Sequence, residues 1–283
     1  NNPGLESIID AASGGVNIAA SFVVFDGFSF TTGSTDLTAL RMQFSGNHVV
    51  NNIFTGGLGV HLLNSGSPDA RLEHNRFDVT DVGVRLGVNV LNATISENII
   101  VSDNIGILVP STTVATNNVT IRGNTIEGPS AAGSGILIEA SLSANSSLLV
   151  RENFVNGWDA GVRITTELPA SGSVTVRANA LQGNTKAIIY DGAGELSAPF
   201  NYYGSDADTA AEVDALIDGT VDFEPFAMTL ANEDLLADRD FDPENGFQPR
   251  IELGLDLSGS KFVYADLDGD EVTVFISRGD FGT

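Results

Sequence analysis

Seven asparagines recur at a nearly regular interval through the middle of the chain, and this repeat restricts the possible folds more than any other feature. Successive members lie 22 to 29 residues apart, and a small residue follows each of the first six, in five cases 7 or 8 residues later. The aligned positions are Asn52, Asn75, Asn98, Asn124, Asn153, Asn179 and Asn201, with Gly59, Gly83, Gly106, Gly135, Gly161 and Ala187 as the small residues. Such self-similarity is the signature of a repeat architecture.

Within each repeat, apolar and polar residues alternate with the period of two that is typical of a β-strand. The repeat that begins at Leu148 has Leu148 and Val150, then Val155, then Val162 and Ile164. Strands this short bury no face alone, but stacking one repeat on the next buries a continuous core and pairs each strand with its copy in the same direction. We therefore expect an all-β parallel β-helix of about 8 coils, with a side-chain ladder at the asparagines and a bend at the glycines.

The repeats resemble those of right-handed, single-stranded parallel β-helix proteins, the pectin-lyase-like superfamily. Lines such as VTIRGNTIEGPSAAGSGILIEA, from Val119, and LLVRENFVNGWDAGVRITT, from Leu148, carry the resemblance, which extends over residues 16–226. It implies a right-handed solenoid of the bacterial extracellular type. Because this fold hosts many activities, the resemblance implies little about chemistry.

The amino-acid composition limits the cellular location and the binding partners that we expect. The 283 residues contain no Cys, and 37 acidic against 13 basic side chains give a net charge of -24. An acidic surface disfavours nucleic acid and anionic lipid, and no apolar run is long enough for a membrane span. We expect an extracellular or bacterial cell-surface protein. The absence of an initiator Met and of a signal peptide suggests a piece of a longer chain.

Three segments follow from the pattern. Residues 1–226 form the β-helix with an N-terminal segment and a C-terminal cap, in which Thr209 and Glu212 are spaced as the capping box of a short helix. Residues 227–254 are an acidic linker. Residues 255–283 are a small, truncated β unit, because KFVYADLDGDEVTVFIS contains two alternating strands around an Asp-Gly turn, a strong hairpin signal.

Basic residues gather in two columns of the aligned repeats. Two positions after the small residue stand Arg41, His61, Arg85 and Arg163, and two positions before the asparagine stand Arg122, Arg151 and Arg177. Guanidinium groups pair with carboxylates in a planar fork, so these six arginines are candidates for binding an acidic glycan. Trp158, in the variable loop, is a candidate platform for a sugar ring. Alternatively, neighbouring acidic residues neutralise the arginines and leave them with a structural role.

A cation site is predicted separately. Asp266, Asp268 and Asp270 alternate in the sequence Asp-Leu-Asp-Gly-Asp, and carboxylate oxygens at such spacing suit calcium. A hairpin turn with solvated charges is the competing interpretation.

Two functions remain open. The favoured one is a structural or adhesive β-helix module of a larger bacterial protein, with polysaccharide or cell-surface components as partners. The alternative is a carbohydrate-active enzyme of the polysaccharide lyase type that acts on an acidic polysaccharide, for which the resemblance implies an Arg or Lys near the sugar carboxylate and often calcium. Its catalytic candidates are Arg85, Arg163 and His61, although no complete set of acid, base and calcium ligands can be assembled from the sequence.

Overall fold

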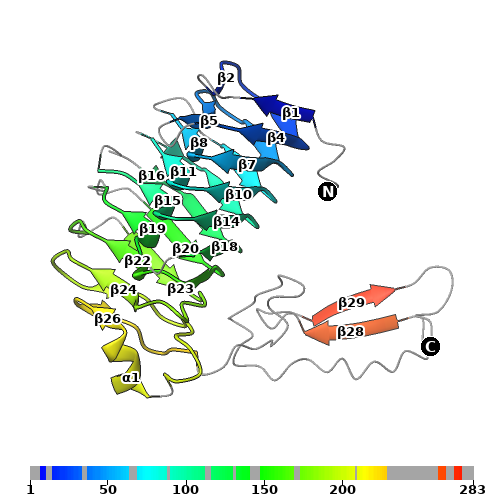
Figure 1. Ribbon diagram of the computed structural model, residues 1–283. Helices are drawn as coiled ribbons and strands as arrows, with labels where there is room; N and C mark the ends of the chain where they lie inside the picture. Colours follow the sequence, from blue (N-terminus) through cyan, green and yellow to red (C-terminus); the bar gives the residue numbers. More distant parts are fainter. Residues whose placement is uncertain are drawn as a thin grey trace.

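The chain winds into one elongated stack of short strands (Figure 1). The computed structural model describes residues 7–10, 15–33, 37–63, 69–87, 90–111, 116–129, 132–140, 147–168, 173–207, 209–227, 261–265 and 271–275. Within these residues it is a parallel β-solenoid of about 7 turns with one short helix. The predicted all-β parallel β-helix is confirmed.

Three parallel sheets form the sides of the solenoid. Most coils add one strand to each of them, whereas the last coils continue sheet A only as isolated bridges. Sheet A contains β1 (Ser7–Asp10), β4 (Phe28–Thr31), β7 (Ile53–Gly56), β10 (Arg76–Val79), β14 (Ile99–Ser102), β18 (Thr125–Glu127) and β21 (Phe154–Asn156). Sheet B contains β2 (Val16–Ile18), β5 (Thr38–Met42), β8 (Leu58–Leu62), β11 (Val82–Leu86), β15 (Ile105–Val109), β19 (Ser134–Ile138), β22 (Ala160–Ile164), β24 (Lys186–Tyr190) and β26 (Ile217–Asp218).

Sheet C is the third side. It contains β3 (Val24–Asp26), β6 (His48–Val50), β9 (Arg71–Glu73), β13 (Thr94–Ser96), β17 (Val119–Arg122), β20 (Ser147–Arg151), β23 (Ser173–Arg177), β25 (Leu196–Ser197) and β27 (Val221–Asp222). A small extra ladder pairs β12 (Val90–Leu91) with β16 (Thr116–Asn117). Every pairing among these strands is parallel, because copies of one strand in successive coils run the same way.

The core is a series of side-chain columns parallel to the solenoid axis. On sheet A, the rings of Phe30, Phe54 and Phe77 stack with centroids 4.9 and 4.8 Å apart and nearly parallel planes. Ile100 and then Ile126 continue the same column in the next coils. All five are fully buried. The spacing of the rings equals the spacing of neighbouring strands, so the register of the sheet fixes the stacking.

The predicted asparagine ladder runs through the corner between sheets C and A. In each step, Oδ1 of one Asn accepts hydrogen bonds from both the backbone N–H and Nδ2 of the Asn in the preceding coil, as Asn75 does for Asn52 at 3.0 and 3.1 Å. Nδ2 of Asn52 also donates to the carbonyls of Val50 and Phe25. All seven asparagines are at most 2 % exposed. The ladder therefore supplies hydrogen-bond partners for the buried backbone groups at this corner, where the chain turns and no neighbouring strand can pair with them.

The repeated glycines of sheet B have a different role from the expected one. Gly83 and Gly106 lie inside strands, and their φ angles are not in the left-handed region. A Cβ on Gly83 would stand 2.6 Å from the carbonyl oxygen of Gly106 and 2.5 Å from Cγ2 of Ile100. The expected bend is therefore replaced by a close approach, in which the next coil and the core side chains occupy the space that a Cβ requires.

A short helix covers the last complete coil, at the end of the stack opposite the N-terminal strands (Figure 1). α1 (Ala210–Ala215) begins with the predicted capping box, in which Thr209 Oγ1 accepts from the Glu212 N–H and Glu212 Oε2 accepts from the Thr209 N–H. Val213 is its buried residue. No helix among the described residues is long and apolar enough to cross a membrane.

The predicted hairpin strands pair as expected: β28 (Lys261–Ala265) and β29 (Glu271–Phe275) are antiparallel. The proposed calcium ligands Asp266, Asp268 and Asp270 lie between them, outside the described residues. The proposed linker at 227–254 also lies outside them, except for residue 227.

Candidate functional site

The outer face of sheet B carries a cationic column made of Arg41, His61 and Arg85. These three residues are direct register partners on β5, β8 and β11, as the alignment of the repeats predicts. Direct partners on neighbouring strands lie about 4.8 Å apart. Their neighbours in each strand, such as Leu40 and Met42 around Arg41, point into the core. The period of the strand therefore turns the three cationic residues outward together.

No carboxylate among the described residues pairs with Arg41 or Arg85. The Nε atom of Arg85 is buried and has no hydrogen-bond partner within the described part of the chain. Between the two guanidinium groups, His61 has its pKa lowered to about 4, first by burial and then by the positive charges of Arg85 and Arg41. The imidazole is therefore neutral at pH 7, and the column combines two cations with a neutral donor and acceptor. In a chain of net charge -24, these two arginines form a local positive site with no carboxylate partner among the described residues.

Apolar side chains flank the cationic column on the same outer face. Leu58, Val82 and Leu108 form a cluster separate from the main core, with Ile105 and Leu137 packed against it. Leu108 and Leu137 continue the column of Arg85 into the next coils. The face therefore changes along the axis from cationic in the early coils to apolar in the middle ones.

Arg163 belongs to the same column but is neutralised. Its Nε and Nη2 donate to Oδ2 of Asp191 at 3.2 and 3.0 Å. The alignment brings Arg163 to the face of Arg85, but the two are separated by the apolar coils of Leu108 and Leu137. The structure thus distinguishes Arg163 from the cationic column.

The second predicted column lies on the outer face of sheet C, and it joins acidic partners there. Arg122, Arg151 and Arg177 are register partners on β17, β20 and β23. Arg151 pairs with Glu152, and Arg122 Nη2 lies 3.9 Å from Oε1 of Glu97. Arg177 also has a partner. This column fits the structural interpretation of the arginines better than the binding interpretation.

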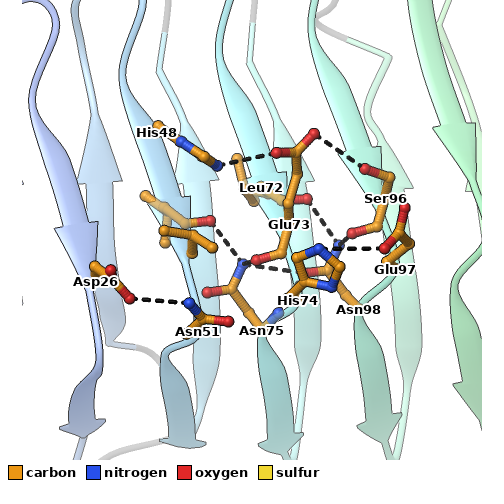
Figure 2. A network of polar contacts seen from close by, with 12 residues as sticks. Asp26, His48, Asn51, Leu72, Glu73, His74, Asn75, Ser96, Glu97 and Asn98 are labelled. Atoms are coloured by element: carbon orange, nitrogen blue, oxygen red, sulfur yellow. Dashed lines mark hydrogen bonds and ion pairs between the residues drawn. The ribbon is translucent and has the colours of Figure 1, made fainter. Parts of the chain in front are cut away.

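A polar network lies in the earlier coils, on strands of sheet C and on the residues that directly follow them (Figure 2). Nε2 of His48 lies 3.0 Å from Oε2 of Glu73, whose Oε1 accepts a hydrogen bond from Ser96 Oγ at 3.3 Å. His74 Nε2 lies 3.2 Å from Oε2 of Glu97. Glu73 stands between the hydroxyl and the imidazole, so His48 has no contact through which it could activate Ser96 as a nucleophile. The network ties adjacent coils together.

The structure contradicts the prediction that Trp158 is a platform for a sugar ring. Its side chain is 0 % exposed, and its Nε1 donates to the carbonyl of Ile126 at 3.3 Å. The ring packs against Gly128 and Gly135, where an added Cβ would stand 2.7 and 3.1 Å from it. A ring without an open face cannot stack on a ligand. An isolated aromatic in a loop gives no sequence signal that separates these two roles.

Comparison with known protein families adds an independent observation. The family model described as periplasmic copper-binding protein (NosD) matches residues 30–212, which span most of the solenoid. The chain belongs to the NosD family. The match and the structure agree on a parallel β-helix protein and do not support the narrower pectin-lyase-like assignment. No curated protein and no solved structure matched the chain. The periplasmic description of the NosD family agrees, at a coarse level, with the expected location outside the cytoplasm.

The name of the NosD family also implies copper, which proteins bind through His, Cys and Met. This chain has no Cys and two Met, of which Met42 is fully buried in the core. Its three His do not converge: His48 lies against Glu73, His74 against Glu97, and His61 between two arginines. Within the described ranges, no three His, Cys, Asp or Glu residues are grouped so that they could hold a metal ion. The described residues therefore do not fit a resident copper ion, and they provide no calcium site either.

The sequence missed the apolar flank of the cationic column. Leu58 and Val82 occupy positions that the alternation assigns to a buried strand, so they read as core residues. In the structure they cluster with Leu108, the register partner of Arg85, and not with the main core. The signal available in sequence was their position three residues before His61 and Arg85.

Proposed function

We propose that this NosD-family chain is a non-catalytic module that acts outside the cytoplasm and binds an acidic polysaccharide along the outer face of sheet B. The observation that carries this proposal is the cationic column of Arg41, His61 and Arg85, which has no carboxylate partner in the described part of the protein. Cationic residues on an acidic protein ordinarily form ion pairs with its own carboxylates, as Arg163 does with Asp191. A column that escapes this pairing retains its charge for an external anion.

The chemistry of the face suits a sugar acid. Guanidinium groups offer planar, paired donors that match a carboxylate. Neutral His61 both donates and accepts hydrogen bonds, as sugar hydroxyls do. Leu137 and Ile105, which are only partly buried and pack against the cluster of Leu58, Val82 and Leu108, offer an apolar surface for the C–H face of a sugar ring. Because the column follows the solenoid axis, a linear polymer would lie along the stack.

Direct binding measurements test this proposal. Polygalacturonate and alginate fragments are titrated into the protein at low salt, with uncharged dextran fragments as the ligand control. We expect saturable binding of the acidic fragments, about 10-fold weaker or more in Arg85→Ala. Arg163→Ala, in the same column but paired with Asp191, is the matched variant and should bind within about 2-fold of the wild type. Equal losses in the two variants, or binding of dextran as tight as that of polygalacturonate, would refute the role of the cationic column.

A polysaccharide lyase activity is the second candidate, and one observation favours it. His61 lies beside two arginines that would hold a sugar carboxylate, and its lowered pKa leaves the imidazole neutral at pH 7, with a free nitrogen that is a weak base. The same fragments, incubated with the protein and followed for unsaturated product in the ultraviolet, test it. Product formed by the wild type and lost in His61→Gln would establish the enzyme. Binding without product would leave the module.

A further inference from the structure

The capped end of the solenoid contains a cleft that the cationic column does not use. It has a volume of about 520 Å³ and lies between the last coils and α1. Its lining comes from the end of β21 (Asn156), the turn before β24 (Gln182 and Asn184) and the loop and helix of the cap (Tyr203, Asp206 and Glu212). This size is within the range of small-molecule sites in proteins.

Two amides in the cleft are not consumed by the fold. The side chains of Asn156 and Gln182 have no hydrogen-bond partner among the described residues. Asn184, by contrast, is fully used: its Oδ1 accepts from the Trp158 N–H, and its Nδ2 donates to the carbonyls of Val155 and Leu181. The amide of Asn184 therefore has a structural role in the wall of the cleft, while the amides of Asn156 and Gln182 retain hydrogen-bond donors and acceptors for a ligand.

Gly183 holds the Asn156 amide in place. It adopts a φ of +72°, and a Cβ at this position would stand 2.2 Å from Oδ1 of Asn156. The turn can pass so close to the amide only because a glycine occupies it. The amide is therefore confined against the turn before β24.

Tyr203 gives the second independent observation. Its side chain is only 3 % exposed, and its hydroxyl has no hydrogen-bond partner in the described structure. Burial is the main cause that raises the pKa of this hydroxyl, and the neighbouring Asn201 amide opposes the rise. The Asn201 amide already donates to the carbonyls of Val176 and Ala198. A buried hydroxyl without a partner is costly to a fold, and a ligand hydroxyl can remove that cost.

The charge around the cleft decides which ligands fit. Asp206 and Glu212 are the ionisable carboxylates in the lining, and no cationic residue contributes to it. An anionic ligand is therefore disfavoured here, unlike at the cationic column. Glu212 is committed to the capping box, and Asp206 accepts from Ser205 Oγ at 3.2 Å. Amide groups that both donate and accept, together with carboxylate oxygens that accept, suit the hydroxyls of an uncharged sugar.

We propose that the cleft between the last coils and α1 is a second binding site, which takes an uncharged mono- or disaccharide unit through Asn156, Gln182 and Tyr203. The site goes beyond the proposed function. It lies at the end of the stack, is formed by other residues, and recognises an uncharged sugar instead of an acidic one. A chain with both sites would hold an acidic polymer along its side and a neutral sugar at its cap.

The experiment uses the intact chain and a panel of neutral sugars: glucose, galactose, N-acetylglucosamine, maltose and cellobiose. Binding is followed by amide NMR and by the fluorescence of Trp158, the single Trp of the chain, which is linked to the wall of the cleft through Asn184. We expect saturable shifts for at least one sugar, with the affinity lowered about 10-fold in Gln182→Ala and in Tyr203→Phe. Tyr203→Phe keeps the buried ring and removes only the hydroxyl.

The controls separate the two sites. Arg85→Ala should keep the neutral sugar and lose the acidic fragments, and Gln182→Ala should do the reverse. If Tyr203→Phe fails to fold, Gln182→Ala alone still tests the site, because the Gln182 side chain makes no hydrogen bond to the described residues. No binding by any sugar of the panel, or binding that both cleft variants leave unchanged, would overturn the proposal.

Discussion

Asn124 accepts two hydrogen bonds through one atom: its Oδ1 receives the backbone N–H of Asn98 at 3.1 Å and the Nδ2 of Asn98 at 2.9 Å. The same relationship recurs from coil to coil along the corner between sheets C and A. Each step uses the acceptor of one coil to satisfy the buried donors of the coil before it. The stability of a coil therefore depends on the side chain supplied by its neighbour.

Replacement of a central ladder residue should be costly. In Asn98→Ala, the buried backbone N–H of Asn75 loses its Oδ1 acceptor and the Leu72 carbonyl loses the Asn98 donor, whereas Asn75 Nδ2 keeps the carbonyls of Val49 and Glu73. We expect the free energy of unfolding to fall by about 2 kcal/mol, since each buried hydrogen bond lost in this way costs about 1 kcal/mol or more. Urea denaturation measures the loss. Asn104→Ala is the control, because its exposed amide bonds only Asp81, and a comparable loss there would contradict the ladder as the cause.

A methyl group in the glycine column should also destabilise the solenoid. In Gly106→Ala, the new Cβ would stand 2.5 Å from the Gly135 carbonyl oxygen and 2.4 Å from Cγ2 of Ile126. The next coil must move, so we expect a loss of about 1–3 kcal/mol, as for an overpacked core. Thermal unfolding followed by circular dichroism checks it. Gly194→Ala, which meets no atom within 4 Å, should cost only the strain of its φ of +93°, about 1 kcal/mol.

His61 should make the fold weaker in mild acid. Its pKa is lowered to about 4 in the folded chain from a usual value of 6.5. Above pH 6.5 the imidazole is neutral in both states and contributes nothing. Between pH 6.5 and 4 the unfolded chain binds the proton and the folded chain does not, so this residue lowers the free energy of unfolding as the pH falls.

The size of this effect is about 1–2 kcal/mol, because solvent screens a half-buried imidazole. Urea unfolding of the wild type and of His61→Gln at pH 7 and pH 4.5 isolates it: the wild type should lose that much more than the variant. NMR titration of the His61 ring gives the midpoint directly, and a value at or above 6.5 would show that neither burial nor the arginines lower it. Bound polygalacturonate should raise the midpoint by neutralising them.

Copper should not stabilise the solenoid. Because a ligand that binds only the folded state raises Tm, one equivalent of Cu²⁺ is expected to shift Tm by less than about 1 °C, and a chelator should leave it unchanged. Differential scanning calorimetry provides the measurement. A saturable rise in Tm that disappears in His48→Gln or His74→Gln would instead place a copper site on the outer face of sheet C.

The solenoid could be predicted because its determinants are periodic. Ladder asparagines, strand alternation and the position of each glycine repeat with every coil, so one coil read correctly predicts the others. The columns of Arg41, His61 and Arg85 and of Arg122, Arg151 and Arg177 follow from the same register. The capping box of Thr209 and Glu212 was also readable, since it depends on residues three apart.

The partners of those side chains could not be predicted, because they are set across coils. Arg163 and Asp191 are 28 residues apart, and nothing in their local sequence marks them as a pair. Trp158 appeared to be a surface residue, although the coils on either side enclose it. The cleft at Asn156, Gln182 and Tyr203 joins three coils and the cap, so no single repeat contains it.

The sequence by itself determined the repeat, and with it the parallel strands, the buried ladder and which residues share a column, since a period of two and a period of one coil leave little freedom in register. Only the tertiary structure decided which members of a column retain their charge. That outcome depends on whether a carboxylate from another coil reaches the guanidinium, as Asp191 reaches Arg163 and no described carboxylate reaches Arg85. Such contacts are a matter of distance in space, which the sequence pattern does not encode.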